Sequence, residues 1–245
     1  MTVRRVHLPP GRVEGAIARL TPEARHYLRD VLRLAPGDEV ELFDGGGGAF
    51  PARIGPDFET LSLGRRREAS RPGVPIWLLF ALSRGEKADL VVQKATELGV
   101  ARLLPFAAER SVVRLEGARA QDRARRWRRI AEEAARQCRR DDVPEVRPPS
   151  ALAAALGEVP GGFGRVVLHA DGGGALAALD PPPAGGWAIV VGPEGGLGAG
   201  ELSLCEAAGW VRVGLGPRTL RAETAAIVGV ALVQARFGDL AGPVP

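Results

Sequence analysis

Residues 211–237 read VRVGLGPRTLRAETAAIVGVALVQARF, two apolar segments joined by a polar loop. The first segment, 211–216, favours a buried strand, and 225–237 is apolar and long enough to be a buried helix. The loop between them holds two arginines and a glutamate next to core elements. Strand, loop and helix in this order build α/β sheets, whose ligands bind beyond the carboxyl ends of the strands. The stretch therefore predicts an α/β fold with a functional loop.

The same alternation extends back along the chain to residue 75. Continuous apolar runs of strand length indicate strands buried on both faces of a sheet. The predicted strands are PIWLLFALS (75–83), VARLLPF (100–106), RVVLHA (165–170) and WAIVVG (187–192). The predicted helices between and after them are EKADLVVQKATELG (86–99), with Gly99 as its stop, and ELSLCEAAG (201–209). A mostly parallel sheet with helices on both faces follows from this order.

A long arginine-rich helix is predicted over 123–140. A repeat of apolar residues every three or four positions marks its buried face: Ala120, Ala124, Trp127, Ala131, Ala134 and Cys138. Arginines cover most of the remaining surface. They either bind a polyanion or form a solvated face paired with nearby acidic residues.

The first 70 residues have a different character. Short strands are predicted at 4–9, 15–20 and 39–44, with a capped helix at 23–34 that begins after Thr21-Pro22. GGGG at 45–48 predicts a hairpin loop, and further short strands follow. This pattern predicts a small β-barrel. The polar segment GRRREASRPGVP (64–75) marks the boundary, so the predicted domains are 1–70 and 71–245.

Charge and composition limit the possible functions. Residues 71–150 carry a net charge of +6, against +1 for 1–70 and −3 for 151–245, and this distribution points to a polyanionic partner. Only Lys87 and Lys94 are lysines. Arginine suits bidentate phosphate contacts, but a GC-rich genome produces the same bias. No run of 18 apolar residues or secretory signal is seen, so a cytoplasmic protein without a membrane span is expected.

The familiar short catalytic motifs do not explain the chain. No Walker A, HExxH, GxSxG or correctly placed GxGxxG sequence occurs. Cys138 and Cys205 are far apart, so neither a disulfide nor a zinc site is expected. His169 ends a predicted strand, where a structural role and a site role are both open. VGPEGGLGAGE (191–201) is a second glycine-rich loop after a strand, suited to close approach of a ligand such as an adenine ring.

Several segments together resemble one family. They are RHYLRDVLRLAPGDEVELFDG (25–45), QKATELGV (93–100), ERSVVR (109–114), RWRRIAEEAARQCRRDDVPEV (126–146), and GPEGG (192–196) followed by LGPRTLRAETA (215–225). Their combination resembles the SPOUT-superfamily methyltransferases, of the small-subunit ribosomal RNA methyltransferase E family, that methylate N3 of a uridine. Leu197 and Thr219 depart from the usual aromatic and aliphatic residues of that pattern.

The resemblance implies a PUA-like RNA-binding barrel followed by an α/β domain with a deep trefoil knot. It further implies S-adenosylmethionine as methyl donor, a homodimer, and ribosomal RNA as partner. From the residues themselves, no metal and no membrane is expected. The cofactor-binding residues it implies are Leu168, Gly192, Glu194, Gly195, Leu215, Gly216, Leu220 and Thr224. The RNA-binding candidates are Arg4, Arg25, Arg65, Arg66, Arg67, Arg110 and Arg136.

Arg221 and Glu223 are the catalytic candidates, with Glu194 behind them. A positive group can stabilise a uracil anion, and a carboxylate can accept its proton. We favour Arg221 as the group that stabilises negative charge and Glu223 as the residue that orients it. An equal alternative is that Glu223 only braces the loop or caps the helix. Two other functions stay open: methylation of a ribose 2′-hydroxyl, and RNA binding without catalysis in ribosome assembly.

Overall fold

The computed structural model describes residues 3–68, 74–111, 117–176, 179–181 and 185–240. The chain forms two compact units, each considered by itself. The first unit comprises residues 1–71 and 132–143, and the second comprises 72–131 and 144–245. One long helix therefore contributes its beginning to the second unit and its end to the first, which the sequence did not predict.

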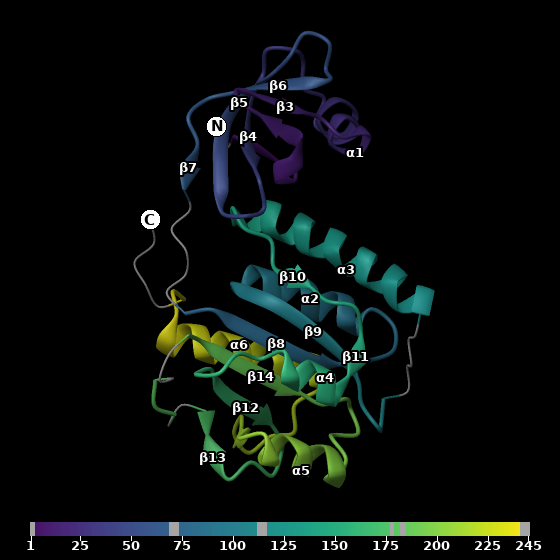
Figure 1. Ribbon diagram of the computed structural model, residues 1–245, viewed down its shortest axis with the longest axis vertical. Coiled ribbons are helices and arrows are strands. Elements are labelled where there is room, and N and C mark those ends of the chain that lie inside the picture. Colours follow the sequence, from purple (N-terminus) through teal and green to yellow (C-terminus); the bar gives the residue numbers. More distant parts are fainter. Residues whose placement is uncertain (1–2, 69–73, 112–116, 177–178, 182–184, 241–245) are drawn as a thin grey trace. The chain divides into compact units, whose positions relative to one another are not determined.

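A seven-stranded sheet builds the first unit (Figure 1). Its order is β1-β4-β5-β6-β3-β2, with β7 paired to β5; β1 and β4 are parallel, and the other pairs are antiparallel. The strands are β1 (Arg4–His7), β2 (Val13–Glu14), β3 (Ile17–Arg19), β4 (Glu39–Phe43), β5 (Gly48–Ile54), β6 (Thr60–Leu63) and β7 (Arg67–Glu68), and a 3-10 turn η1 spans Pro10–Arg12. Strand β7 lies within the segment predicted to be a linker.

The helix predicted at 23–34 is shorter and changes type. The Thr21 hydroxyl accepts a hydrogen bond from the Ala24 amide at 3.1 Å, and Pro22 opens α1 (Pro22–His26), as the capping pattern predicted. The chain then widens into a π-helical turn, η2 (Tyr27–Val31), where the Leu32 amide donates to the Tyr27 carbonyl at 2.9 Å. One residue further, Arg33 takes a left-handed conformation with φ 56°, which ends the helix.

Asp44 organises the glycine hairpin between β4 and β5. This buried carboxylate accepts hydrogen bonds from the amides of Gly46 and Gly48, each at 2.8 Å, and pairs with Arg66 at 3.0 Å. Burial alone would raise the pKa of Asp44, but these bonds outweigh burial and lower it. The GGGG loop is therefore a fixed turn around one charge.

Arg5 joins the first strand to the segment that follows the long helix. Its side chain is only 3% exposed and forms ion pairs with Glu41, at 2.7 Å, and with Asp141. It also donates to the Arg140 carbonyl at 3.0 Å and lies over the Phe43 ring at 4.6 Å. A buried guanidinium with this many partners ties two segments distant in sequence into one unit.

We expect Arg5→Leu to destabilise the first unit strongly. Removing the buried guanidinium takes the ion-pair partner from Asp141 and leaves Glu41 with Arg67 alone, and breaking a buried ionic network in this way costs about 3–5 kcal/mol. Arg4→Leu, the matched control, removes an exposed arginine from the same strand and should change stability by less than about 0.5 kcal/mol. Urea denaturation followed by circular dichroism would measure both. Equal losses in the two variants would contradict the role of Arg5.

An eight-stranded sheet forms the second unit, and all of its pairings are parallel. Its order is β10-β9-β8-β14-β12-β15-β13, with β11 paired to β9. The strands are β8 (Ile76–Ala81), β9 (Val100–Ala107), β10 (Glu145–Val146), β11 (Ser150–Ala151), β12 (Gly164–Leu168), β13 (Gly174–Ala175), β14 (Trp187–Val191) and β15 (Val211–Gly214). The predicted parallel α/β sheet is thus present.

Helices cover the two faces of this sheet (Figure 1). They are α2 (Lys87–Glu97), α3 (Gly117–Cys138), α4 (Leu152–Gly157), α5 (Ala199–Ala207) and α6 (Ala222–Phe237). Helices α4 and α5 share one core cluster with alternate residues of the strands, whereas α2 and α6 pack together and against β9, β8 and β14. Helix α4 was not predicted, and α6 begins three residues earlier than expected.

The predicted inner face of the long helix α3 is buried. Trp127 is 1% exposed, its ring meets Phe80 edge-on at 5.8 Å, and its indole N–H donates to Asp89 at 2.9 Å. The alanines of the repeat are buried with it, while Cys138 at the end is only half-buried. Asp89 also pairs with Arg126 at 2.5 Å, so part of the arginine surface neutralises an acidic residue of α2.

Candidate functional site

Three loops meet at one edge of the parallel sheet. Strand β12 lies between β14 and β15 and is hydrogen-bonded to both, with Val166 opposite Ile189 on one side and Val211 on the other. Because the strands are parallel, the chain leaves all three at the same edge. The polar loops that follow β14 and β15 are therefore neighbours, together with the turn at His169.

A small pocket of about 70 Å³ lies among the residues that follow β12 and β15. It is lined by His169, Ala170, Leu215, Gly216, Arg218, Thr219, Leu220 and Ala225. Three of the cofactor candidates, Leu215, Gly216 and Leu220, are therefore brought together here. His169, which the sequence left open between two roles, lies on the same wall, and its ring nitrogen accepts a hydrogen bond from the Asp171 amide at 3.2 Å.

Gly216 and Gly192 are glycines for different reasons. Gly216 has φ 98°, which L side chains rarely adopt, and a Cβ on it would point into open space beside the pocket. A Cβ on Gly192 would lie 3.1 Å from both the amide nitrogen and Cγ of Leu197. Gly192 therefore leaves room for Leu197 of its own loop, and the close approach of a ligand there stays a prediction.

The loop 192–198 is held by side chains from other elements. Lys87 at the start of α2 pairs with Glu194 at 2.5 Å, and Arg110 donates to the Gly195 carbonyl at 2.9 Å. The Lys87 hydrogen bond lowers the pKa of Glu194. Glu201 in α5 accepts from the amides of Gly198 and Glu109, at 2.8 and 2.9 Å. The sequence did not predict the tethers of Lys87, Arg110 and Glu109, because they join positions 85–107 residues apart.

Two further cofactor candidates, Leu168 and Thr224, each adjoin a pocket residue in sequence but do not line the pocket themselves. Leu168 is buried, and its Cδ1 would be 2.5 Å from a Cβ on Gly229, so its side chain packs on helix α6. Thr224 is exposed in the first turn of that helix.

The two catalytic candidates stand at the start of α6. Arg221 is the N-cap residue and is exposed, and Glu223 lies in the first turn. Oxygen Oε2 of Glu223 is buried and has no hydrogen-bond partner among the described residues. No ion pair between Arg221 and Glu223 is found among the described residues, and the expected role of Glu223 as orienting partner stays a prediction. Within the described part of the chain, a carboxylate oxygen without a partner and a guanidinium without an ion pair are thus two residues apart at the positive end of a helix.

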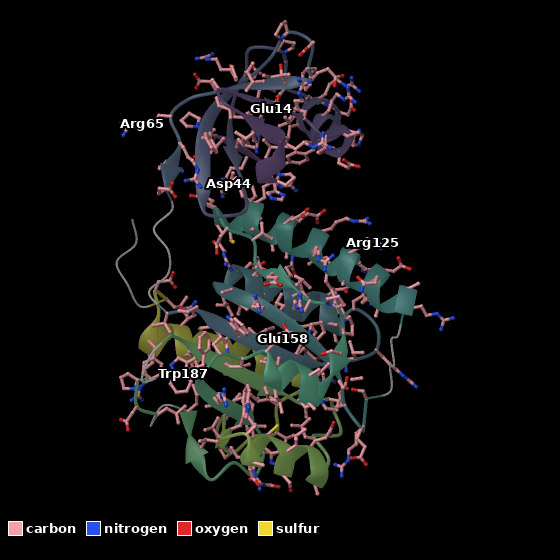
Figure 2. The ribbon with its side chains drawn as sticks, in the orientation of Figure 1. Glu14, Asp44, Arg65, Arg125, Glu158 and Trp187 are labelled. Atoms are coloured by element: carbon pink, nitrogen blue, oxygen red, sulfur yellow. The ribbon has the colours of Figure 1, made fainter. Side chains whose placement is uncertain are left out.

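The RNA-binding candidates differ in how free their charges are. Arg25 pairs with Glu59, Arg67 with Glu41, and Arg66 with Asp44 and Glu68. Arg136 lies over the Tyr27 ring at 3.9 Å. Arg4 and Arg65 are exposed and have no ion pair in the described part of the chain, and Figure 2 shows Arg65 projecting away from the ribbon.

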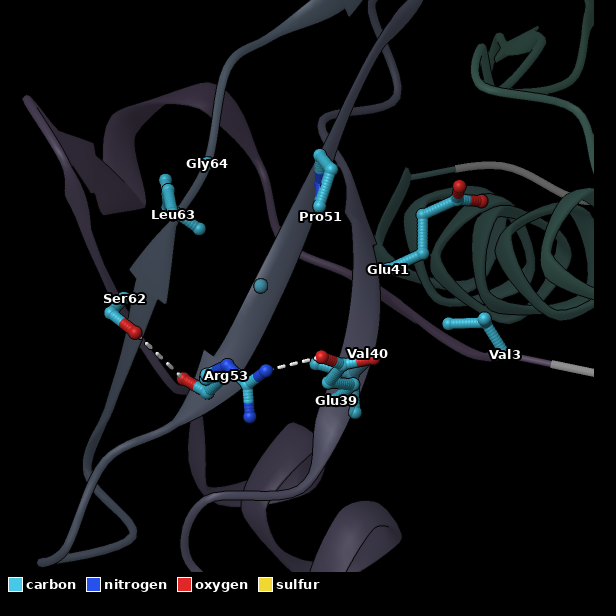
Figure 3. Close-up of a pocket in the computed structure, with 10 residues that line it drawn as sticks. Val3, Glu39, Val40, Glu41, Pro51, Arg53, Ser62, Leu63 and Gly64 are labelled. Atoms are coloured by element: carbon cyan, nitrogen blue, oxygen red, sulfur yellow. Dashed lines mark hydrogen bonds and ion pairs between the residues drawn. The ribbon is translucent and has the colours of Figure 1, made fainter.

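A larger pocket, of about 420 Å³, lies on the outer face of β4, β5 and β6 in the first unit (Figure 3). Its wall includes Pro51 and Leu63 and an ion pair between Glu39 and Arg53. This larger pocket has walls of mixed charge, and its residues are distant in sequence from every candidate loop. We therefore distinguish it from the site that follows β12 and β15. Pocket size alone therefore does not locate the chemistry.

Comparison with known proteins identifies the chain's relatives. Residues 70–234 match the family model of an RNA methyltransferase domain, and residues 20–63 match that of an RNA methyltransferase PUA domain. Ribosomal RNA small subunit methyltransferase E of Mycobacterium tuberculosis is 33% identical over 89% of this chain and 86% of its own length. The chain belongs to this methyltransferase family. The corresponding Bacillus subtilis protein is 30% identical over 87% of the chain and 88% of its own length.

Two solved structures of relatives contain the cofactor. The small subunit methyltransferase E of Neisseria gonorrhoeae, bound to S-adenosylmethionine, is 31% identical, with a TM-score of 0.89 over 97% of this chain and 99% of that one. A Legionella pneumophila methyltransferase with bound S-adenosylmethionine is 32% identical, with a TM-score of 0.89 over 98% of this chain and 100% of that one. The mixed α/β architecture with a PUA domain is thus that of the family.

The described residues hold no group of three or more His, Cys, Asp or Glu side chains suited to a metal ion. None of their helices is both long and apolar enough to span a bilayer.

We expect Gly216→Ala to weaken cofactor binding more than tenfold, because Gly216 lines the pocket and its left-handed backbone would be strained by about 1–2 kcal/mol. Gly209→Ala is the matched control. Gly209 has φ 78°, and a Cβ there also meets nothing within 4 Å, but it follows α5 away from the pocket. Calorimetric titration with S-adenosylmethionine would compare them. Similar affinities in both variants would contradict the placement of the pocket.

Proposed function

We propose that this protein transfers a methyl group from S-adenosylmethionine to N3 of a uridine in small-subunit ribosomal RNA. Family membership supports the reaction class, and the relatives' bound S-adenosylmethionine supports the donor. The observation that carries the proposal here is the pocket beyond β12 and β15. Ala225 lines this pocket two residues after Glu223, whose buried Oε2 has no hydrogen-bond partner among the described residues. Because its proposed substrate is ribosomal RNA, we propose a cytoplasmic location for the protein.

The residues of the pocket fit such a cofactor. Leu215 and Leu220 offer apolar surface for a nucleoside, and open space lies above the glycine backbone at Gly216. No lysine lines the pocket, which suits a ligand without a triphosphate. When bound, S-adenosylmethionine supplies an electrophilic methyl group. We propose that Gly192, Glu194 and Gly195 complete the site from the neighbouring loop.

The chain's own residues must then accept one proton and stabilise one developing negative charge. Uracil N3 carries a hydrogen that has to leave before or as the nitrogen takes up the methyl group. We propose that Oε2 of Glu223, which has no hydrogen-bond partner among the described residues, accepts the proton from N3. The exposed guanidinium of Arg221 stabilises negative charge on the uracil as the proton leaves.

The order of strands supports the knot that the family resemblance implies. Strand β15 lies beyond β12 in the sheet, yet the helix that follows it, α6, packs on β14, β8 and α2. The chain must therefore cross back past the turn behind β12. We propose that loop 215–221 threads this turn and forms the trefoil knot around the cofactor pocket.

A homodimer is the second part of the proposal. Helix α6 is apolar on nearly all sides, as helices are when both faces are covered. Leu90 on α2 and Leu232 on α6 are each 40% exposed, on two helices that pack together. We propose that a second copy covers this surface.

We expect Arg221→Ala and Glu223→Gln to lower the single-turnover methylation rate by about 100-fold each. Loss of the carboxylate should also flatten the acid limb of the pH–rate profile, whereas Arg221→Ala should leave that limb in place. Glu206→Gln, an exposed carboxylate of α5 paired with Arg212, is the control and should be unaffected. A near-normal rate in Glu223→Gln would return Glu223 to a structural role.

We expect Arg65→Gln to weaken RNA binding and to reduce the slope of log affinity against log salt by roughly 0.7–0.9, the contribution of one phosphate contact. Arg67→Gln is the paired control: its guanidinium is already bound to Glu41, so its effect should be smaller. Filter binding across a salt series would measure both slopes. An unchanged slope in Arg65→Gln would show that Arg65 is only solvated.

The alternatives have different products. Digestion of the methylated RNA and mass spectrometry separate 3-methyluridine from a 2′-O-methyl nucleoside. A protein that only binds RNA would yield neither, and calorimetry would detect no binding of S-adenosylmethionine.

A further inference from the structure

Arg110 lies across the glycine loop that was expected to hold the cofactor. It follows β9, and its Nη1 donates to the Gly195 carbonyl at 2.9 Å. The aliphatic stem lies over the same residue, because a Cβ on Gly195 would be 3.5 Å from Cβ and 3.6 Å from Cδ of Arg110. The sequence assigned Gly195 to the cofactor and Arg110 to the RNA, and the structure joins them.

The turn that carries Arg110 is fixed at both ends. Ser111 closes it, with its Oγ accepting from the Ala108 amide at 3.1 Å and its own amide donating to the Ala108 carbonyl at 3.0 Å. Glu201 then links the Glu109 amide to the Gly198 amide. The backbone on both sides of the Arg110–Gly195 contact is therefore tied together, so the state of Arg110 bears directly on the shape of loop 192–198.

Arg110 also has binding capacity left over. A guanidinium has five N–H donors, and in the described part of the chain Arg110 uses one of them for Gly195. The residue is exposed, so its free edge can take the two oxygens of a phosphate side by side. Lys87, the other cation on this loop, is instead bound to the Glu194 carboxylate and has no such reserve of charge.

We propose that Arg110 is a positioning residue that couples the two substrates: one edge of its guanidinium holds the Gly195 carbonyl while the other binds a phosphate of the RNA. The inference rests on the proposed function. A bound phosphate restricts the arginine side chain and thereby strengthens its hold on the cofactor loop. By thermodynamic linkage, RNA raises affinity for the cofactor by the same factor as the cofactor raises affinity for RNA.

The test measures this factor without turnover. S-adenosylhomocysteine, the demethylated cofactor, is titrated calorimetrically into the protein alone, with unmodified small-subunit RNA, and with unmodified small ribosomal subunits. We expect at least one of the two RNA forms to tighten binding to the wild-type protein about fivefold to tenfold, within the usual range of coupling between two sites. Hydrogen exchange at residues 194–198 should slow further when RNA is added.

Three variants separate coupling from folding. Arg110→Gln should lose the coupling and the added exchange protection. Arg110→Lys keeps a positive charge for RNA but lacks the planar guanidinium that can bind two acceptors at once. This variant should therefore bind RNA and show a coupling factor near one. Arg84→Gln is the matched control: this exposed arginine follows β8, has no ion pair in the described residues, and should leave the factor unchanged.

The possible results distinguish failure of the Arg110 coupling from failure of the proposed methyltransferase function. A wild-type protein that methylates RNA but binds the two ligands independently would overturn the coupling alone. Retention of the full factor in both Arg110 variants would overturn it as well. A wild-type protein that binds no cofactor under any condition would overturn the proposed function and the inference together.

Discussion

The hydrogen-bond ladder that holds β12 between β14 and β15 is the constraint on which the site depends. Five residue pairs align β12 with β14 and three align it with β15, all in parallel. This register brings the turn at His169 and the loops behind the other two strands to one edge. A different strand order would scatter the same glycines and arginines over separate parts of the surface. The backbone ladder thus determines which polar residues can meet.

Glycine gives these loops their path, and charged side chains from elsewhere fix it. Gly216 supplies a backbone conformation that other residues avoid, and Gly192 makes room for Leu197. Neither feature by itself prevents a loop from moving. Lys87, Arg110 and Glu201 provide that restraint from three separate elements. The second loop, 215–221, has fewer such contacts, and its residues are mostly exposed.

Much of the fold could be predicted from the sequence because periodicity reports local environment. The apolar runs identified the main strands of the parallel sheet, and the alanine and tryptophan repeat identified the inner face of α3. Strand order could not be obtained in this way, since β14 and β12 look alike as sequences. The site was predictable where it lies on glycine-rich loops. Its tethers were not, because an exposed arginine and one that reaches a distant carbonyl look the same in sequence.

Arg4 and Arg5 also show that the sequence alone does not reveal which arginine has a distant partner. They are adjacent and chemically identical, yet one is exposed and the other is among the most buried charges of the chain. The partner of Arg5, Asp141, lies 136 residues further on. During synthesis at roughly 5–20 residues per second, about 7–27 seconds separate the two. For that time Arg5 can pair only with Glu41 and lacks Asp141, so the first domain to leave the ribosome is completed only after more than half of the chain has been made.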